Sequence, residues 1–143
     1  MTYILDTNAV SALMRGDVAA IARLAAANRA EVKVPQPVVA EIAYGIQRLP
    51  ASKRRQRLQD RFDLVCGELA RAAWTDDVSE RFGYLKATLE RRGQRIEDFD
   101  AAIAAHALAY DSVLVTPNVS DMARIPGLAV EDWGVSATPR SRT

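Results

Sequence analysis

Cysteine and histidine are almost absent from this 143-residue sequence, which has only Cys66 and His106. A single cysteine cannot form an internal disulfide, and no set of Cys and His residues has the spacing of a zinc site. A reducing compartment therefore suits the chain best. Glycine is also scarce, at 7 residues, and none of them belongs to a glycine-rich loop of the kind that cradles phosphates.

Long hydrophobic runs and an excess of charge of one sign are missing as well. No apolar stretch approaches the roughly 20 residues that span a bilayer, and residues 1–6 contain no basic leader. We therefore expect a cytoplasmic protein with no membrane segment. The formal net charge of +1 gives no support for nucleic-acid binding from composition alone. Any such function has to come from a site.

The composition that remains is that of an ordinary globular protein. Hydrophobic residues make up 49% of the chain and charged residues 26%, which leaves too little polar bias for a disordered chain. A chain of this length is expected to build one domain around one core.

Short apolar runs alternate with longer stretches of helical period, which predicts an α/β fold with a mainly parallel sheet. Strands are expected at residues 2–5, 31–35, 71–74, 113–115 and 128–130. Helices are expected over a short segment after Asn8 and over 18–28, from Pro37 to about 46, over 52–69, from 78 to about 92 and from Asp98 to about 110.

Three residues are expected to set helix ends. Asn8 and Asp98 are predicted N-caps, because their side chains can accept hydrogen bonds from free backbone N–H groups. Gly93 is predicted to end its helix in the left-handed conformation.

Acidic residues are placed where the strands of a parallel sheet deliver their carboxyl ends, the edge at which such sheets bind ligands. Asp6 directly follows the first strand, and Asn118 and Asp121 lie in the loop after the 113–115 strand. Glu41 lies one turn into its helix, and Asp100 lies in the first turn of another. If these groups meet, three or four negative charges share a small volume, which predicts a hard cation such as Mg²⁺.

Such an ion can polarise a phosphoryl oxygen and supply hydroxide near neutral pH, while another carboxylate orients or deprotonates the water. The chain has no Ser, His and acid arrangement on a nucleophile elbow. Phosphodiester hydrolysis is therefore the predicted chemistry.

The sequence resembles PIN-domain toxins of the VapC group in an ordered series of segments that spans about residues 3–133. These segments are 4–8 (ILDTN), 38–45 (VVAEIAYG), 91–93 (RRG), 99–107 (FDAAIAAHA), 115–118 (VTPN) with Asp121, 125–128 (IPGL) and 130–133 (VEDW). The resemblance implies a three-layer α/β/α PIN-like fold. We expect this domain to extend over residues 1–137, and the polar residues 138–143 to form a frayed tail. The resemblance also implies a metal-dependent endoribonuclease that acts as a toxin, forms a homodimer and is inhibited by a cognate antitoxin protein.

Carried over residue by residue, the resemblance implies that Asp6 and Asp100 are the metal ligands, for Mg²⁺ or Mn²⁺, with Glu41 as a third acid that acts through water. At the fourth corner many PIN domains carry an acid shortly after the Val-Thr segment, where this chain has Asn118. Asp121 is the alternative for that corner, or it caps the local turn.

Several other residues have a structural and a functional interpretation. His106 is more typical of a packing or surface residue than of a catalytic one, and Trp74 and Trp133 are more typical of packing than of base stacking. Basic runs occur at residues 53–57 and 91–95. Such runs are usually solvated faces, and RNA phosphate binding is the alternative, with more weight on the second run.

Two other functions compete with the nuclease. One is a non-catalytic RNA- or protein-binding module on the same scaffold, with the acids serving only caps and turns. The other is a phosphotransfer protein with Asp6 as the phosphoacceptor. It is disfavoured because that chemistry requires a second acid at position 8, where this chain has Asn8.

Overall fold

The computed structural model describes residues 1–134. In these residues five parallel strands form one sheet in the order β3-β2-β1-β4-β5. The strands are β1 (Tyr3–Leu5), β2 (Val32–Pro35), β3 (Ala70–Ala72), β4 (Val113–Val115) and β5 (Val130–Glu131). Tyr3 pairs with Val32 on one side and with Val113 on the other, so β1 is the central strand. The expected domain end at residue 137 and the expected tail at 138–143 lie outside the described residues.

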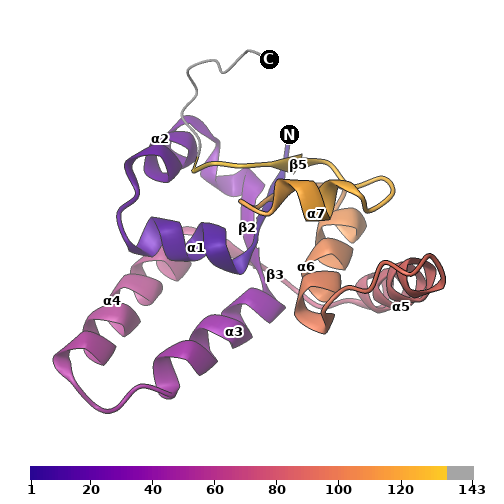
Figure 1. Cartoon of the computed structure of the whole chain (residues 1–143). Helices are drawn as coiled ribbons and strands as arrows, with labels where there is room; N and C mark the ends of the chain where they lie inside the picture. The colour runs from indigo at the N-terminus through magenta and orange to yellow at the C-terminus, as the bar shows by residue number, and fades with distance from the viewer. Residues whose placement is uncertain (135–143) are drawn as a thin grey trace.

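Helices cover both faces of this sheet. They are α1 (Thr7–Met14), α2 (Val18–Ala26), α3 (Gln36–Gln47), α4 (Lys53–Glu68), α5 (Asp76–Arg91), α6 (Asp98–Ala109) and α7 (Val119–Ala123), with a 3-10 turn at Arg29–Glu31. In Figure 1, α1, α2 and α4 lie to the left of the strands and α3 lies below them, while α5 and α6 lie to the right. This is what right-handed crossovers require when the strand order reverses at β1. The predicted three-layer α/β/α fold is confirmed.

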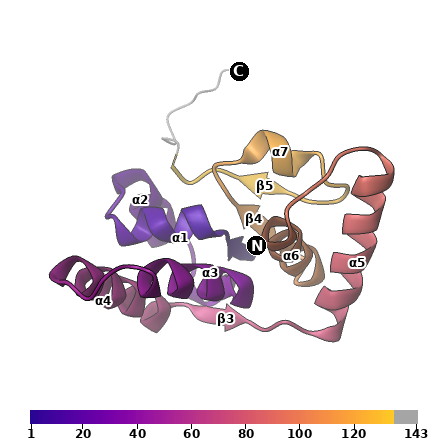
Figure 2. The same ribbon diagram turned by 60° about the horizontal axis from the view of Figure 1, so that its bottom comes forward.

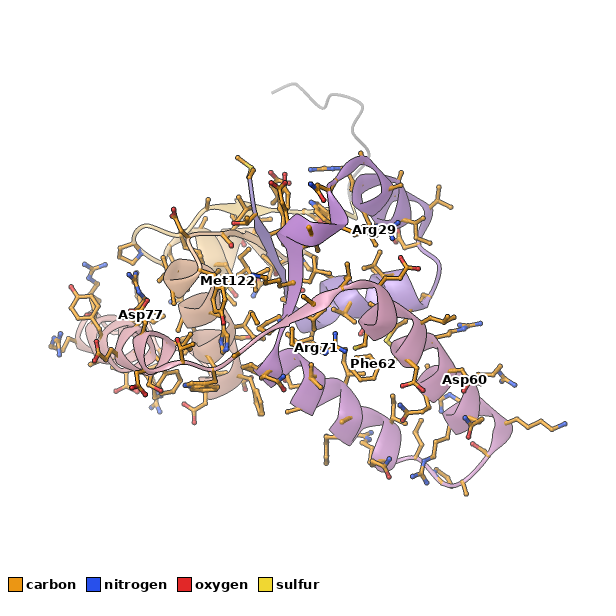
Figure 3. The ribbon with its side chains drawn as sticks, turned by 180° about the vertical axis from the view of Figure 1, so that it is seen from behind. Arg29, Asp60, Phe62, Arg71, Asp77 and Met122 are labelled. Atoms are coloured by element: carbon orange, nitrogen blue, oxygen red, sulfur yellow. The ribbon has the colours of Figure 1, made fainter. Side chains whose placement is uncertain are left out.

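The core is built from the strands and from helix α6. Ile4, Leu5, Val34 and Leu114 are fully buried, and every residue of α6 from 101 to 107 is buried. A helix that is apolar on all sides has to be enclosed, and Figure 2 shows α6 between the strands and α5. The small side chains of this helix allow its close approach to the sheet. Helix α4 behaves differently, because Phe62 (Figure 3) is buried while most of its neighbours in the helix are exposed.

The expected helix starts at Asn8 and Asp98 are wrong by one or two residues. Asp6 caps α1, because its extended backbone places the carboxylate where the Ala9 N–H donates to it. Glu97 occupies the N-cap position of α6, and Asp98 is the first helical residue, paired with Lys86 at 3.0 Å.

The other differences concern the shortest elements. The expected strands at 71–74 and 128–130 lie at Ala70–Ala72 and Val130–Glu131. Helix α7 was not predicted at all, because five residues are too few to establish a helical period. Among the described residues, no helix is long and apolar enough to span a membrane.

Gly93 ends α5 as predicted, with φ +71°. The backbone N–H of Gln94 donates to the Leu89 carbonyl at 2.8 Å, and that of Gly93 donates to the Glu90 carbonyl at 3.0 Å. These two hydrogen bonds form the closing motif that favours glycine.

The same substitution at two glycines of this region is expected to have opposite effects. Gly93→Ala should lower the free energy of unfolding by about 1 kcal/mol, because an L side chain is strained at positive φ. Gly83→Ala should raise it by about 1 kcal/mol, because Gly83 lies inside α5 with open space where a Cβ would be. Urea unfolding measures both, and equal effects of the two changes would contradict this description of the helix end.

His106 is a core residue, in agreement with the packing interpretation. Its side chain is 0% exposed, its Nδ1 lies 2.7 Å from the Ala102 carbonyl oxygen, and its ring lies edge-on to Trp74. Nε2 has no hydrogen-bond partner in the described part of the chain. Since the carbonyl can only accept, Nδ1 carries a proton, and the burial of Nε2 without a partner in residues 1–134 favours the neutral ring. Burial lowers the pKa of His106, and the Ala102 hydrogen bond offsets part of this effect.

Burial of a neutral histidine makes stability depend on pH. Below pH 6.5 His106 is protonated in the unfolded chain, whereas in the folded chain it stays neutral down to its lower pKa. The free energy of unfolding therefore falls as the pH falls from 6.5 to that lower pKa. His106→Asn, which keeps a donor near the Ala102 carbonyl, should flatten this part of the curve. Unfolding free energies measured from pH 7.5 down to 5 test this, and parallel curves for the two proteins would contradict it.

Candidate functional site

The site lies where the strand order reverses, at the carboxyl ends of β1 and β4. Asp6 follows β1 and Thr116 follows β4, and the Asp6 N–H donates to the Val115 carbonyl at 3.0 Å. The chain leaves these two neighbouring strands towards opposite faces of the sheet, which opens a crevice beyond their ends. Side chains that follow β1 and β4 therefore point into a position that α/β proteins commonly use for ligands.

Asp6 is held rigidly at this position and is only 7% exposed. Its Oδ1 accepts a hydrogen bond from the Ala9 N–H at 2.7 Å. Burial raises the pKa of Asp6, hydrogen bonds from the Thr116 hydroxyl and the Ala9 N–H offset part of this rise, and the charge of Asp100 adds to it. Asp6 is therefore both the cap of α1 and a desolvated acid beside Asp100.

Several neighbouring carboxylates act electrostatically on Asp100. Burial raises its pKa, and the charges of Glu97, Glu41 and Asp121 raise it further. Glu41 comes from α3 and Asp121 from α7, so helices far apart in the sequence bring their acids to one helix start. We call Asp6, Glu41, Asp100 and Asp121 the acid rim.

Glu41 is fixed by a residue next to Asp6. The hydroxyl of Thr7 donates a hydrogen bond to Oε1 of Glu41, which ties α3 to the first residue of α1. The side chain of Thr7 therefore orients Glu41, while Asn8 supports Asp6 through its backbone N–H.

Thr116 was missed by the sequence analysis as a site residue. It is a fully buried polar residue, and its hydroxyl both lowers the pKa of Asp6 and accepts a hydrogen bond from the Asn118 N–H at 3.0 Å. Its position as a polar residue directly after the buried strand β4 was the sequence feature that could have identified it as a site residue.

Asn118 and Asp121 both remain candidates for the fourth position of the site, as in the sequence prediction. Asn118 takes the N-cap position of α7, but its side chain forms no capping hydrogen bond. Asp121 lies in the first turn of α7 and not in a loop, and it is exposed. Its charge acts on Asp100. Both side chains therefore remain free to face a ligand.

The acid rim lacks a positive partner. In the stretch from residue 1 to 134, no Lys, Arg or His forms an ion pair with any of its four carboxylates. The same stretch also contains no three His, Cys, Asp or Glu side chains grouped closely enough to hold a metal ion together. The charges of Glu41 and Asp121 nevertheless act on Asp100, and that of Asp100 acts on Asp6, so the acids of the rim are electrostatically coupled without three of them converging on one ion position.

This donor set nevertheless suits a hard divalent cation. Its ligand atoms are all carboxylate oxygens, and Mg²⁺ usually takes one or two direct carboxylates and keeps several waters. Asp6 and Asp100 supply such a pair. Burial raises the pKa of both carboxyl groups, and the charge of Asp100 raises the pKa of Asp6 further. A cation bound between them would stabilise the charged form of both carboxylates.

The remaining singled-out residues lie elsewhere. Trp133 is buried and packs edge-on against Tyr3 with ring centroids 5.3 Å apart, as a packing residue should. Arg91, Arg92 and Arg95 are exposed around the end of α5, which agrees with a solvated face and leaves them accessible.

Comparison with known proteins finds PIN-domain and VapC relatives. A family model described as PIN domain matches residues 3–128. Ribonuclease VapC2 of Rickettsia felis is 31% identical over 135 residues, covering 93% of this chain and 98% of that protein. The tRNA(fMet)-specific endonuclease VapC of Shigella flexneri is 26% identical over 137 residues, with the same coverage.

Solved structures share the fold over nearly the whole chain. The crystal structure of VapBC2 from Rickettsia felis bound to a promoter DNA fragment has a TM-score of 0.81 at 29% identity, covering 93% of this chain and 99% of that one. DNA-bound VapBC from Salmonella typhimurium has a TM-score of 0.83 at 25% identity, covering 93% and 98%.

The desolvated state of Asp100 predicts the effect of its neutralisation. Its carboxylate form is disfavoured in the folded protein, so it costs stability above its raised pKa, and the cost vanishes as pH falls through that pKa. Asp100→Asn should raise the metal-free free energy of unfolding at pH 7.5 by about 0.5 kcal/mol, a value that allows for solvent screening of a half-exposed group.

Asp98→Asn is the matched control, because Asp98 lies in the same first turn but is exposed and paired with Lys86. It loses the same favourable interaction with the helix dipole without relieving repulsion at the rim. A more stable Asp98→Asn variant together with a less stable Asp100→Asn variant, in urea unfolding with a chelator present, would contradict the electrostatics described here.

Proposed function

This chain belongs to the PIN-domain family, and on that premise we propose that it is a VapC-type endoribonuclease toxin. It hydrolyses RNA phosphodiester bonds at the acid rim with Mg²⁺, or Mn²⁺ in its place, as cofactor. One observation carries the proposal: carboxylates from the end of β1 and from α3, α6 and α7 meet around Asp100 at the switch point without a cationic partner in residues 1–134. The relatives named as ribonuclease and endonuclease, which this chain matches over 93% of its length, support the same activity.

Asp6 and Asp100 would hold the cation, since both are desolvated and Asp6 lies within the field of Asp100. When bound, a divalent ion neutralises charge on a phosphoryl oxygen and lowers the pKa of water. Thr116 and the Ala9 N–H keep Asp6 in place, so the ligand needs little reorganisation. This fixed placement is the contribution of the strand end.

Glu41 acts on the attacking water. With the Thr7 hydroxyl holding one of its carboxylate oxygens, the other oxygen can accept the proton of the water. The water oxygen then bonds to phosphorus as the bond from phosphorus to a ribose oxygen breaks, and the departing ribose oxygen keeps the electron pair and takes up a proton from solvent. Asn118, whose side chain forms no capping hydrogen bond, would donate to a phosphate oxygen, and Asp121 would contribute negative charge that favours a bound cation.

We also propose partners for this chain. The two related structures described above are VapBC assemblies, which supports a cognate antitoxin protein that occludes the acid rim or its approach. A homodimer follows from the family resemblance. RNA is the substrate, and its phosphates are the groups that meet the cation and Asn118.

Neutralising either metal-binding acid should abolish cleavage. Asp6→Asn and Asp100→Asn should each lower the rate of Mg²⁺-dependent RNA cleavage by at least about 100-fold. The asparagine introduced in Asp6→Asn can still cap α1, so the loss should not come from unfolding. The measurement is cleavage of a labelled RNA by purified protein with Mg²⁺, with EDTA, and with Mg²⁺ added back.

Asp98→Asn is the control for this assay too, and it should cleave like wild type. Full activity in either rim variant would refute the assigned mechanism. RNA binding by the wild-type protein without any cleavage would favour the non-catalytic binding module instead.

A further inference from the structure

Arg124 joins α7, which carries Asp121, to the connection that leads into α6, the helix that carries Asp100. Its Nε donates to the Asp121 carbonyl at 2.9 Å, and its Nη2 donates to the Arg95 carbonyl at 3.1 Å. The first bond lies within the end of α7, where Arg124 is the C-cap residue. The second spans 29 residues of sequence. One guanidinium therefore bridges two backbone carbonyls in different parts of the fold.

The bridge fixes the connection that leads into α6. Arg95 lies in the segment between α5 and α6, two residues before the N-cap Glu97, and the first turn of α6 carries Asp100. Figure 2 shows this connection running from the end of α5 to α6 below α7. In the described residues, no other side chain from outside it donates a hydrogen bond to residues 94–97.

The other end of the bridge is anchored in the core. Met122 of α7 is 3% exposed (Figure 3), and Ile125, directly after Arg124, is 2% exposed. Helix α7 is thus held by apolar packing on one side while Asp121 remains exposed on it. The Arg124 guanidinium attaches the exposed connection to this anchored short helix.

The charges explain why such a tie is needed. Asp121 and Asp100 repel each other, so their two segments would tend to move apart. Within residues 1–134 Arg124 forms no ion pair with any carboxylate, and its donors go to main-chain oxygens. It therefore holds the segments together without taking the place of a cation at the acid rim.

We propose that Arg124 is a positioning residue that sets the spacing between Asp100 and Asp121 by bridging α7 to the connection before α6. The inference rests on the proposed function, because the spacing matters for the cation and for cleavage. Two donors at fixed angles are required, so a lysine, which carries one flexible ammonium group, cannot replace it.

The test compares Arg124→Gln and Arg124→Lys with Arg81→Gln. Arg81 is exposed on α5 and, within residues 1–134, pairs only with Asp77 one turn away, so its change removes the same charge without touching the rim. Mn²⁺ affinity is measured by calorimetry without RNA. Both Arg124 variants should bind Mn²⁺ about 10-fold more weakly, the usual effect of losing a group that orients a metal ligand, and Arg81→Gln should bind like wild type.

Two further readouts locate the effect. Amide hydrogen exchange at residues 94–97 should become faster in both Arg124 variants, while exchange in β1 and β2 stays unchanged. In RNA cleavage kcat should fall while KM changes little, because the ligand set and not the RNA contact is disturbed. Faster exchange throughout β1 and β2 would show a general loss of structure and overturn a local role.

The outcomes separate this inference from the proposed function. Recovery of wild-type Mn²⁺ affinity in Arg124→Lys would show that charge alone matters and would overturn the bridging role. Unchanged affinity and exchange in both variants, with an active wild type, would overturn the role of Arg124 and leave the nuclease intact. A wild type that neither binds Mn²⁺ nor cleaves RNA would overturn the proposed function itself.

Discussion

The burial of an unpaired carboxylate at the end of the central strand is the constraint on which the rest of this structure depends. Asp6 is 7% exposed, and burial raises its pKa despite hydrogen bonds from Thr116 and Ala9. A buried anion is costly unless it is paired or coordinates a cation. The position of β1 between β2 and β4 leaves the Asp6 carboxylate little contact with the solvent that would relieve this cost. A bound cation, as in the function that we propose, would offset this cost.

The surrounding polar groups hold the acids without neutralising them. Thr7 donates to Glu41, Thr116 supports Asp6, and Arg124 binds main-chain carbonyls. Each of these donors keeps an acid or its segment in place, and none supplies a counter-charge at the acid rim in residues 1–134. These groups therefore orient the acids but do not compensate their charge. In the function that we propose, the bound cation compensates it.

Sequence reasoning predicted the large elements and failed at local and long-range detail. The spacing of Val78, Leu85 and Leu89 predicted α5, because a long helix repeats its apolar face several times. Asn8 was predicted as the cap of α1 where Asp6 forms it, since both residue types fit the same rule and only the backbone conformation decides between them. Helix α7 is too short to show a period, and the contact of Arg124 with residue 95 has no sequence signal. Asp6 and Asp121 could be named because strand ends meet at one edge, whereas Glu41 and Asp100 lie in helices and were assigned through the resemblance. How these acids act on one another depends on how the helices pack.

The most direct test of the central claim is the position of a bound ion. Crystals of the wild-type protein grown with Mn²⁺ can be measured at a wavelength where manganese scatters anomalously. Our account predicts an anomalous peak between the carboxylates of Asp6 and Asp100. A peak held by other residues, with Asp6 and Asp100 free of it at saturating Mn²⁺, would contradict the account.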